Sequence, residues 1–187
     1  MKVTFAVVGK TNDDYLKTGE ELYINRLRHY VKINVIVIPQ AKKPGSLSTL
    51  VQKKHEAKQI MKLIDKFDYI ILLDERGKQY SSEGFAGALQ KFMNRGIKNL
   101  LFIAGGPYGF DQEVENKANE KLSLAKMTFS HQMVRLIFLE QLYRAFTIIR
   151  GEPYHNESLE REVGFRSVFE VAGSLWRINL ARSIKND

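Results

Sequence analysis

The sequence has no cysteine, which excludes disulfide bonds and thiolate metal sites. It also has no uninterrupted apolar stretch of membrane-spanning length, and its start, MKVTFAVVGK, shows no signal-peptide cleavage pattern. Internal repeats and low-complexity tracts are missing as well. From these absences we expect a soluble cytoplasmic protein that binds neither a membrane nor a metal ion.

The residues that are present fit one globular domain with a basic surface. A chain of 187 residues, 44% of them hydrophobic, is long enough to bury a real core and too apolar to be globally disordered. Its formal net charge is +8, which favours an anionic partner, and nucleic acid is the commonest one. The alternative is a charge excess that only aids solubility.

Apolar runs and helical periods alternate along the chain. Strand-like and helix-like segments follow one another, which predicts a three-layer α/β fold with a mostly parallel sheet and helices on both faces. The runs DYIILLD and NLLFIAG lack polar alternation, as expected of strands covered on both sides. The predicted strands are Val3–Val8, Ile33–Pro39, Asp68–Asp74 and Asn99–Gly105, and the helices lie at about 12–30, 48–66, 82–94, from 111, and 131–149.

The last of these helices, HQMVRLIFLEQLYRAFTII, is apolar around most of its circumference. A helix of this kind must be buried on several sides. A second subunit supplies the additional cover most easily, so we expect a symmetric homodimer. The alternative is a very central helix in a monomer.

The turn GGPYGF, which follows the strand Asn99–Gly105, is rich in glycine but is not a phosphate loop. It lacks the Gly-Lys-Ser/Thr ending of a Walker loop. It also lies too late in the chain for a dinucleotide fingerprint, and Pro107 interrupts it. A ligand without phosphate that needs a close backbone approach fits better, and a tight turn without a ligand is the alternative.

Three loops are predicted to meet at the carboxyl ends of the strands, where α/β sheets bind ligands. They are Leu73–Gly77, Gly105–Gly109 and Ser123–Phe129, the last within the stretch Glu120–Arg135, which we expect to be irregular.

Four motifs together resemble the SPOUT methyltransferases: LLDERG, FIAGGPYG, LSLAKMTFSHQMVRLIFLEQLYRAF and RGEPYHN. The resemblance covers residues 1 to about 157 and is greatest to the small family that methylates N3 of a pseudouridine in bacterial large-subunit ribosomal RNA. It implies a SPOUT alpha/beta-knot with a C-terminal trefoil knot, a homodimer, and ribosomal RNA in the assembled ribosome as the partner.

The resemblance also implies S-adenosylmethionine as the cofactor, held in the knot by mostly backbone groups. The residues it assigns to cofactor binding are Leu73, Gly105, Leu124, Ala125, Lys126, Met127, Thr128 and Phe129.

For catalysis, N3 of a uracil-type base must lose its proton, and a cation near O2 and O4 would stabilise the resulting anion. Arg135 is the first candidate for this cation, and the alternative is an ion pair with Glu140 or another buried acid inside the dimer. His131, Tyr154 and His155 are candidates for positioning the base or taking the proton, with parts of the site coming from both subunits. His131 could instead lie in the first helical turn behind a capping Ser130.

Two further segments carry expectations. A basic stretch suits RNA phosphates, although it could be an ordinary helix surface: Lys42, Lys43, Lys53, Lys54 and Lys58. Residues 158–187 extend past the family's usual end and form an extension of uncertain origin beside the 1–157 methyltransferase domain, with a possible amphipathic helix around Phe165–Ala181.

Two other functions compete with the methyltransferase. One is a non-catalytic basic RNA-binding or ribosome-assembly protein of the same fold. The other is a nucleotide-binding α/β protein, against which the missing phosphate-loop lysine counts.

Overall fold

Apolar runs form the centre of a parallel sheet, as predicted, and the sheet has five strands where the sequence predicted four. The computed structural model describes residues 1–40 and 48–155. The strand order is β2-β1-β4-β3-β5, with parallel pairing throughout. The strands are β1 (Lys2–Val8), β2 (Lys32–Ile38), β3 (Tyr69–Gln79), β4 (Asn99–Ala104) and β5 (Glu120–Ser123).

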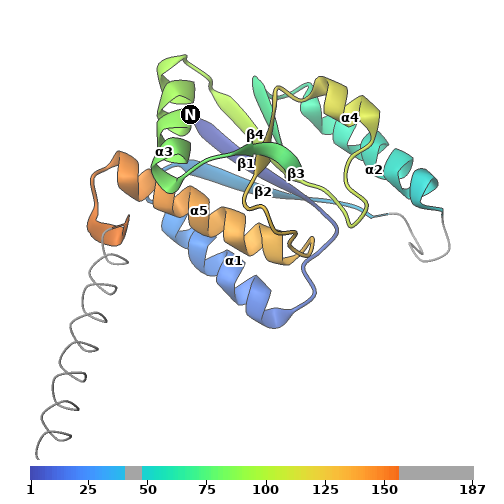
Figure 1. The fold of residues 1–187 in the computed structure, drawn as a ribbon, viewed down its shortest axis with the longest axis horizontal. Helices are drawn as coiled ribbons and strands as arrows, with labels where there is room; N and C mark the ends of the chain where they lie inside the picture. Colours follow the sequence, from blue (N-terminus) through green and yellow to red (C-terminus); the bar gives the residue numbers. More distant parts are fainter. Residues whose placement is uncertain (41–47, 156–187) are drawn as a thin grey trace, which may run out of the picture.

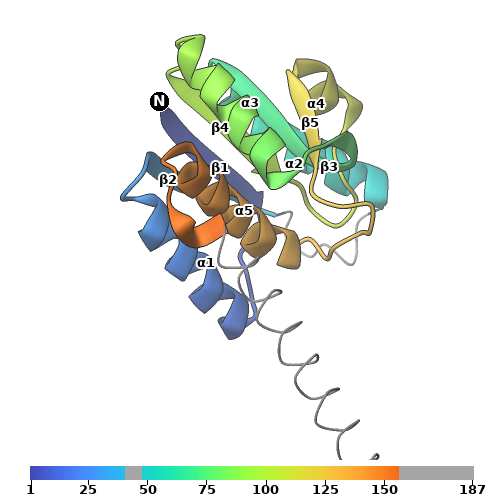
Figure 2. The ribbon, with the colours of Figure 1, turned by 60° about the vertical axis from the view of Figure 1, so that its left-hand side comes forward.

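Helices cover both faces of this sheet, which confirms the predicted α/β class (Figures 1 and 2). The helices are α1 (Asp14–Leu27), α2 (Thr49–Ile64), α3 (Ser82–Asn94), α4 (Gln112–Lys117) and α5 (Met133–Ile149), followed by the 3-10 helix η2 (Pro153–His155). One core lies between the sheet and α1, α3 and α5, and the other between the sheet and α2 and α4. The trefoil knot remains a prediction.

The sheet differs from the sequence prediction at its outer edge. Glu120–Ser123, expected to be irregular, forms the strand β5, which pairs with β3. Strand β3 continues past Asp74 to Gln79, and a bulge places both Leu73 and Lys78 opposite Leu122. At this irregularity Asp74, Glu75 and Arg76 leave the paired ladder and line the pocket at the carboxyl edge of the sheet, while Gly77 lies against the backbone of β5.

Aromatic packing holds the apolar helix α5 on the sheet. The ring of Phe138 lies 4.6 Å from that of Phe5 in β1 and 4.7 Å from that of Phe102 in β4. Burying a side chain of this kind contributes about 1.5–3 kcal/mol. The opposite side of α5 is only half covered within one chain, at Met133, Leu136 and Ile137.

None of the helices in the described part of the chain is both long and apolar enough to cross a membrane. The extension after residue 157, its possible helix and the domain boundary before it lie outside the described residues, and so do Lys42 and Lys43. The two-part domain division therefore remains a prediction.

Candidate active site

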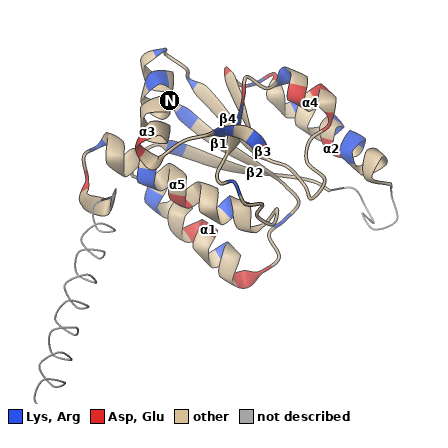
Figure 3. Cartoon of the chain, viewed as in Figure 1, with Lys and Arg blue, Asp and Glu red and all other residues tan. Residues whose placement is uncertain are grey.

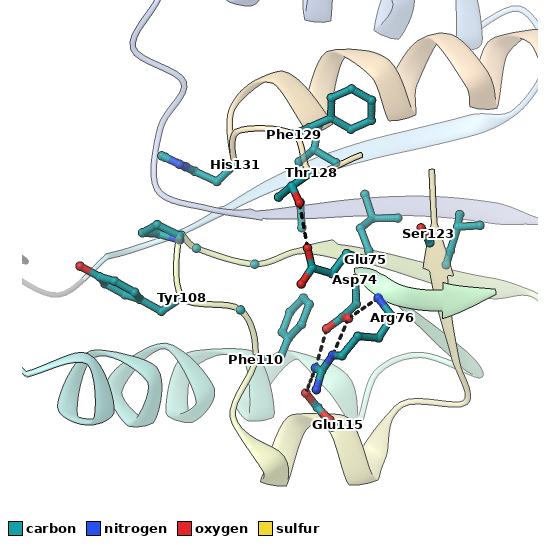
Figure 4. A pocket seen from close by; sticks show the side chains of 18 of the residues that line it. Asp74, Glu75, Arg76, Tyr108, Phe110, Glu115, Ser123, Thr128, Phe129 and His131 are labelled. Carbon is teal, nitrogen blue, oxygen red and sulfur yellow. Dashed lines mark hydrogen bonds and ion pairs between the residues drawn. The ribbon is translucent and has the colours of Figure 1, made fainter. Parts of the chain in front are cut away.

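The three predicted loops converge on one pocket of about 810 Å³ at the carboxyl ends of β3, β4 and β5 (Figure 4). Residues 73–76, 105–109 and 123–129, except Lys126, line it. The predicted convergence is confirmed, and the volume suits a ligand of nucleoside size.

The glycine turn after β4 brings backbone close to its neighbours at Gly106. A Cβ added there would lie 2.7 Å from Oε2 of Glu56, closer than real contacts allow. Gly109 has a φ of +70°, which residues with a side chain rarely adopt. The turn therefore favours glycine at position 109 for its backbone conformation, whereas a side chain at position 106 would displace the Glu56 carboxylate. The backbone of the turn forms one wall of the pocket.

Glu56 is a buried acid beneath this turn. Its side chain is 3% exposed, and its carboxylate accepts hydrogen bonds from Gln52 Nε2 at 3.2 Å and from the backbone N–H of Gly106. Burial raises the pKa of Glu56 above its usual range. Sequence reasoning missed this residue, although an acid four positions before the buried Ile60 was a usable signal.

An ion-pair network supports the pocket floor. Arg76 donates to both oxygens of Asp74 at 2.9 Å and to Glu115 at 2.6 Å, and Lys121 pairs with Glu115 at 2.6 Å (Figure 4). The hydrogen bonds from Arg76 lower the pKa of Asp74. The pKa of Glu115 is also lowered, mainly by its hydrogen bond with Lys121. The side chain of Arg76 is 62% exposed, so each pair contributes little to stability, but together they fix the β3 bulge against α4.

Glu75 reaches across the pocket mouth to the third loop. Its Oε2 accepts a hydrogen bond from Thr128 Oγ1 at 3.1 Å (Figure 4). No ion pair to Glu75 occurs within the described residues. Its negative charge therefore remains available to a ligand.

The pocket lining carries more negative than positive charge. Four carboxylates and two permanent cations leave an excess of two negative charges, with His131 as the remaining titratable group near neutral pH: Asp74, Glu75, Asp111, Glu115, Lys53 and Arg76. An acidic pocket with a glycine wall suits a cationic nucleoside such as a sulfonium and disfavours phosphates. Within the described residues no group of three or more histidine and acidic side chains could hold a metal ion.

Most of the predicted cofactor residues line the pocket, and their roles there remain predictions. They are Leu73, Gly105, Leu124, Ala125, Met127, Thr128 and Phe129. Lys126 is exposed and lies outside the lining.

His131 lies at the pocket, just before α5 (Figure 4). The predicted capping residue Ser130 is not the N-cap of α5, which is Gln132, but its Oγ accepts a hydrogen bond from the backbone N–H of Met133 at 3.1 Å. Burial and the nearby charge of Arg135 lower the pKa of His131, so its imidazole is neutral at physiological pH.

Arg135 is fully buried and does not line the pocket. Its guanidinium donates to the backbone oxygens of Val8 at 2.7 Å, Gly9 at 3.1 Å and His131 at 3.0 Å, and to Thr11 Oγ1 at 2.9 Å. The predicted alternative partner Glu140 instead pairs with Arg144 at 2.7 Å. Arg135 thus ties the start of α5 to the end of β1.

Tyr154 lies at the other end of α5, in the short helix η2. Its hydroxyl donates to Glu140 Oε1 at 3.2 Å, and the guanidinium of Arg144 lies 4.8 Å from its ring centre. Helix η2 folds back on α5, so Tyr154 packs against Glu140 and Arg144 of that helix and does not line the pocket that His131 borders.

The fold and the pocket define a parallel α/β protein with a nucleoside-type site at the carboxyl edge of its sheet. A family model described as "Predicted SPOUT methyltransferase" matches residues 1–155. The chain therefore belongs to the SPOUT methyltransferase family, which confirms the predicted membership. It is an S-adenosylmethionine-dependent methyltransferase, as predicted.

Curated relatives match nearly their whole length. One from Christiangramia forsetii is 49% identical over 83% of this chain and 99% of its own, and one from Cytophaga hutchinsonii is 51% identical over 83% and 100%. Both are named "Ribosomal RNA large subunit methyltransferase H". Among solved structures, the SpoU methyltransferase AviRb from Streptomyces viridochromogenes is 11% identical, with a TM-score of 0.45, over 81% of this chain and 61% of its own.

Proposed function

We propose that this protein methylates N3 of a pseudouridine in large-subunit ribosomal RNA, in the cytoplasm and on assembled ribosomes. The observation that carries the proposal is the acidic, glycine-walled pocket in a chain about half identical to two relatives named for ribosomal RNA methylation. The pocket suits a cationic methyl donor, and the basic chain suits RNA.

When bound, S-adenosylmethionine supplies an activated methyl group, so the protein must align the base, exclude water and accept one proton. We propose His131 as the acceptor of the N3 proton. Its place at the pocket and its lowered pKa support this role, because a neutral imidazole can take up a proton at physiological pH.

For Arg135 we propose a positioning role. Its bonds to Val8, Gly9 and Thr11 hold the start of α5, and its charge helps keep His131 neutral. A direct contact between Arg135 and the base anion would require the guanidinium to leave these acceptors, and it remains a prediction.

We propose a homodimer in which Tyr154 and His155 serve the partner's site. Within one chain Tyr154 contacts Glu140 and Arg144 and is not part of the pocket lining, which supports this arrangement. The half-covered side of α5 and the exposed Tyr15 (65%) and Leu22 (47%) on the neighbouring α1 offer an apolar surface for the second subunit. Sedimentation of the protein as a monomer at micromolar concentration would contradict the dimer.

The test is transfer of labelled methyl from S-adenosylmethionine to ribosomes from cells that lack this protein, with free ribosomal RNA alongside. We expect label in large-subunit RNA of assembled ribosomes, at N3 of a pseudouridine. The variant His131→Ala should lose most of the transfer while still binding cofactor, and the exposed His29→Ala should keep it.

Absence of label on both substrates would point to an RNA-binding protein without turnover. Equal labelling of free RNA would contradict the requirement for the assembled ribosome.

A further inference from the structure

A second cavity, of about 620 Å³, lies between α3 and the outer strands β3 and β5. It shares no lining residue with the cofactor pocket. Its floor is formed partly by Gly84, Gly87 and Ala88 of α3, and a Cβ added at Gly87 would meet nothing within 4 Å. The cavity is therefore an open groove beside the helix, called the α3 groove below.

Three cations border the α3 groove: Lys78 from β3, Lys91 from α3, and Arg95, which directly follows α3. Figure 3 shows the basic segments of β3 and α3 in blue. None of them forms an ion pair with another described residue. The carboxylate of Glu120 is the acidic group of the lining, so three cations and one anion leave a surplus of two positive charges.

Two tyrosine rings stand beside these cations. Lys78 Nζ lies 4.5 Å from the ring centre of Tyr80, and Arg95 Cζ lies 5.8 Å from that of Tyr69. The hydroxyl of Tyr80 donates to Glu120 at 2.6 Å, and the ring of Tyr69 packs on Phe92 at 4.8 Å. The rings are thus held in place before any ligand arrives.

The two cavities differ in the sign of their charge. The lining of the cofactor pocket has an excess of two negative charges, one of which Lys121 offsets from just outside the lining, whereas the α3 groove has the opposite excess. An enzyme that brings a polyanion such as RNA to an acidic pocket needs positive charge elsewhere on its surface to attract that polyanion.

We propose that the α3 groove binds a single-stranded segment of the substrate RNA. Lys78, Lys91 and Arg95 contact phosphates, and a base that stacks on Tyr80 displaces the Lys78 ammonium, which lies over this ring in the free protein. Fixed aromatic rings bordered by unpaired cations are the combination that binds single strands, whereas an acidic peptide would use the charges alone. This site extends the proposed function, because the bound RNA is the ribosomal substrate.

The test is equilibrium binding of a short labelled single-stranded RNA to the full chain at several salt concentrations. The double variant Lys91→Ala/Arg95→Ala should bind about tenfold more weakly, and its slope of log K against log salt should be shallower by about 1.4, as for two lost phosphate contacts. The matched control, Lys62→Ala/Lys66→Ala, removes two exposed charges at and just after the end of α2 and should bind within about twofold of the wild type.

A second variant tests the groove without removing a cation. Gly87→Glu places a carboxylate in open space on α3 and should weaken RNA binding, whereas Gly87→Ala should not. Unchanged melting temperature and cofactor affinity establish that each variant is folded. Equal weakening by both double variants, or none by either, overturns the proposal. The proposal is also overturned if polyglutamate, at equal total charge, competes with the labelled RNA as well as unlabelled RNA does.

Methyl transfer to ribosomes separates this proposal from the proposed function. If the wild type does not methylate ribosomes but Lys91→Ala/Arg95→Ala selectively loses RNA binding, the proposed groove stands and the proposed function is rejected. If Lys91→Ala/Arg95→Ala methylates ribosomes normally and with an unchanged KM, the proposed RNA site in the groove is rejected and the proposed function stands.

Discussion

The carboxylate of Glu56 lies directly beneath Gly106, so close that a Cβ at position 106 would approach its Oε2 to 2.7 Å. The acid in α2 and the glycine turn after β4 thus form one unit, in which the backbone of Gly106 donates to a buried side chain. Because the turn is a wall of the cofactor pocket, its shape depends on a residue that does not line the pocket.

Substituting Gly106 with alanine should therefore impair cofactor binding. We expect Gly106→Ala to weaken S-adenosylmethionine binding about tenfold, because the added Cβ displaces the Glu56 carboxylate and breaks its hydrogen bond with the backbone of the turn. Isothermal titration calorimetry measures this change. Gly87→Ala, where the added Cβ meets nothing, is the matched control and should bind normally. Normal S-adenosylmethionine binding by Gly106→Ala would show that the contact between Glu56 and the turn does not set the shape of the pocket.

Glu75 should discriminate between the cationic cofactor and its neutral-sulfur product. In Glu75→Gln the amide oxygen can still accept the hydrogen bond from Thr128, but the negative charge is gone. We expect affinity for S-adenosylmethionine to fall about threefold relative to S-adenosylhomocysteine, in line with the roughly 0.6 kcal/mol of an exposed charge interaction. Equal losses for both ligands would assign Glu75 to loop positioning alone.

Arg135 should contribute strongly to stability. Arg135→Ala leaves the buried oxygens of Val8 and Gly9 without this donor, which should cost roughly 3 kcal/mol in the free energy of unfolding. Urea denaturation measures the loss. Arg135→Lys should recover only part of it, because an ammonium cannot reproduce the planar set of donors. A lysine variant as stable as the wild type but inactive would instead support a contact with the base.

The lowered pKa of His131 makes a prediction about stability and pH. The unfolded chain binds a proton at this residue at a higher pH than the folded chain does, so folding becomes less favourable as pH falls below about 6.5. In His131→Gln the free energy of unfolding should fall less as the pH is lowered, because this proton uptake is gone. The comparison is urea denaturation of both proteins between neutral and mildly acidic pH, and identical slopes would contradict the assignment.

Patterns that repeat over many residues predicted most of the fold. The uninterrupted apolar runs at the centres of β3 and β4 fixed the sheet's interior, and the convergence of three loops followed from parallel strands ending at one edge. Strand β5 escaped prediction because four residues, Glu120–Ser123, are too few to show a period.

The site was harder to predict, because its key contacts join distant segments. The sequence marked Arg135 as exceptional in an apolar helix, but nothing local showed that its acceptors are the backbone oxygens of Val8 and Gly9. Backbone acceptors carry no signal in residue identity. Glu56 was visible only as an acid on an apolar helix face, and Gly106 as one glycine among several.

The bond from Arg135 to Val8 joins positions 127 residues apart. Strand β1 lies between β2 and β4 and pairs with β2 as far as Val8, but the Arg135 bonds to its end form only when α5 is present. During synthesis the end of β1 therefore lacks these bonds until α5 has been made. Folding that waits for such distant contacts is slow, so the closing of these bonds should come only after α5 has been synthesised.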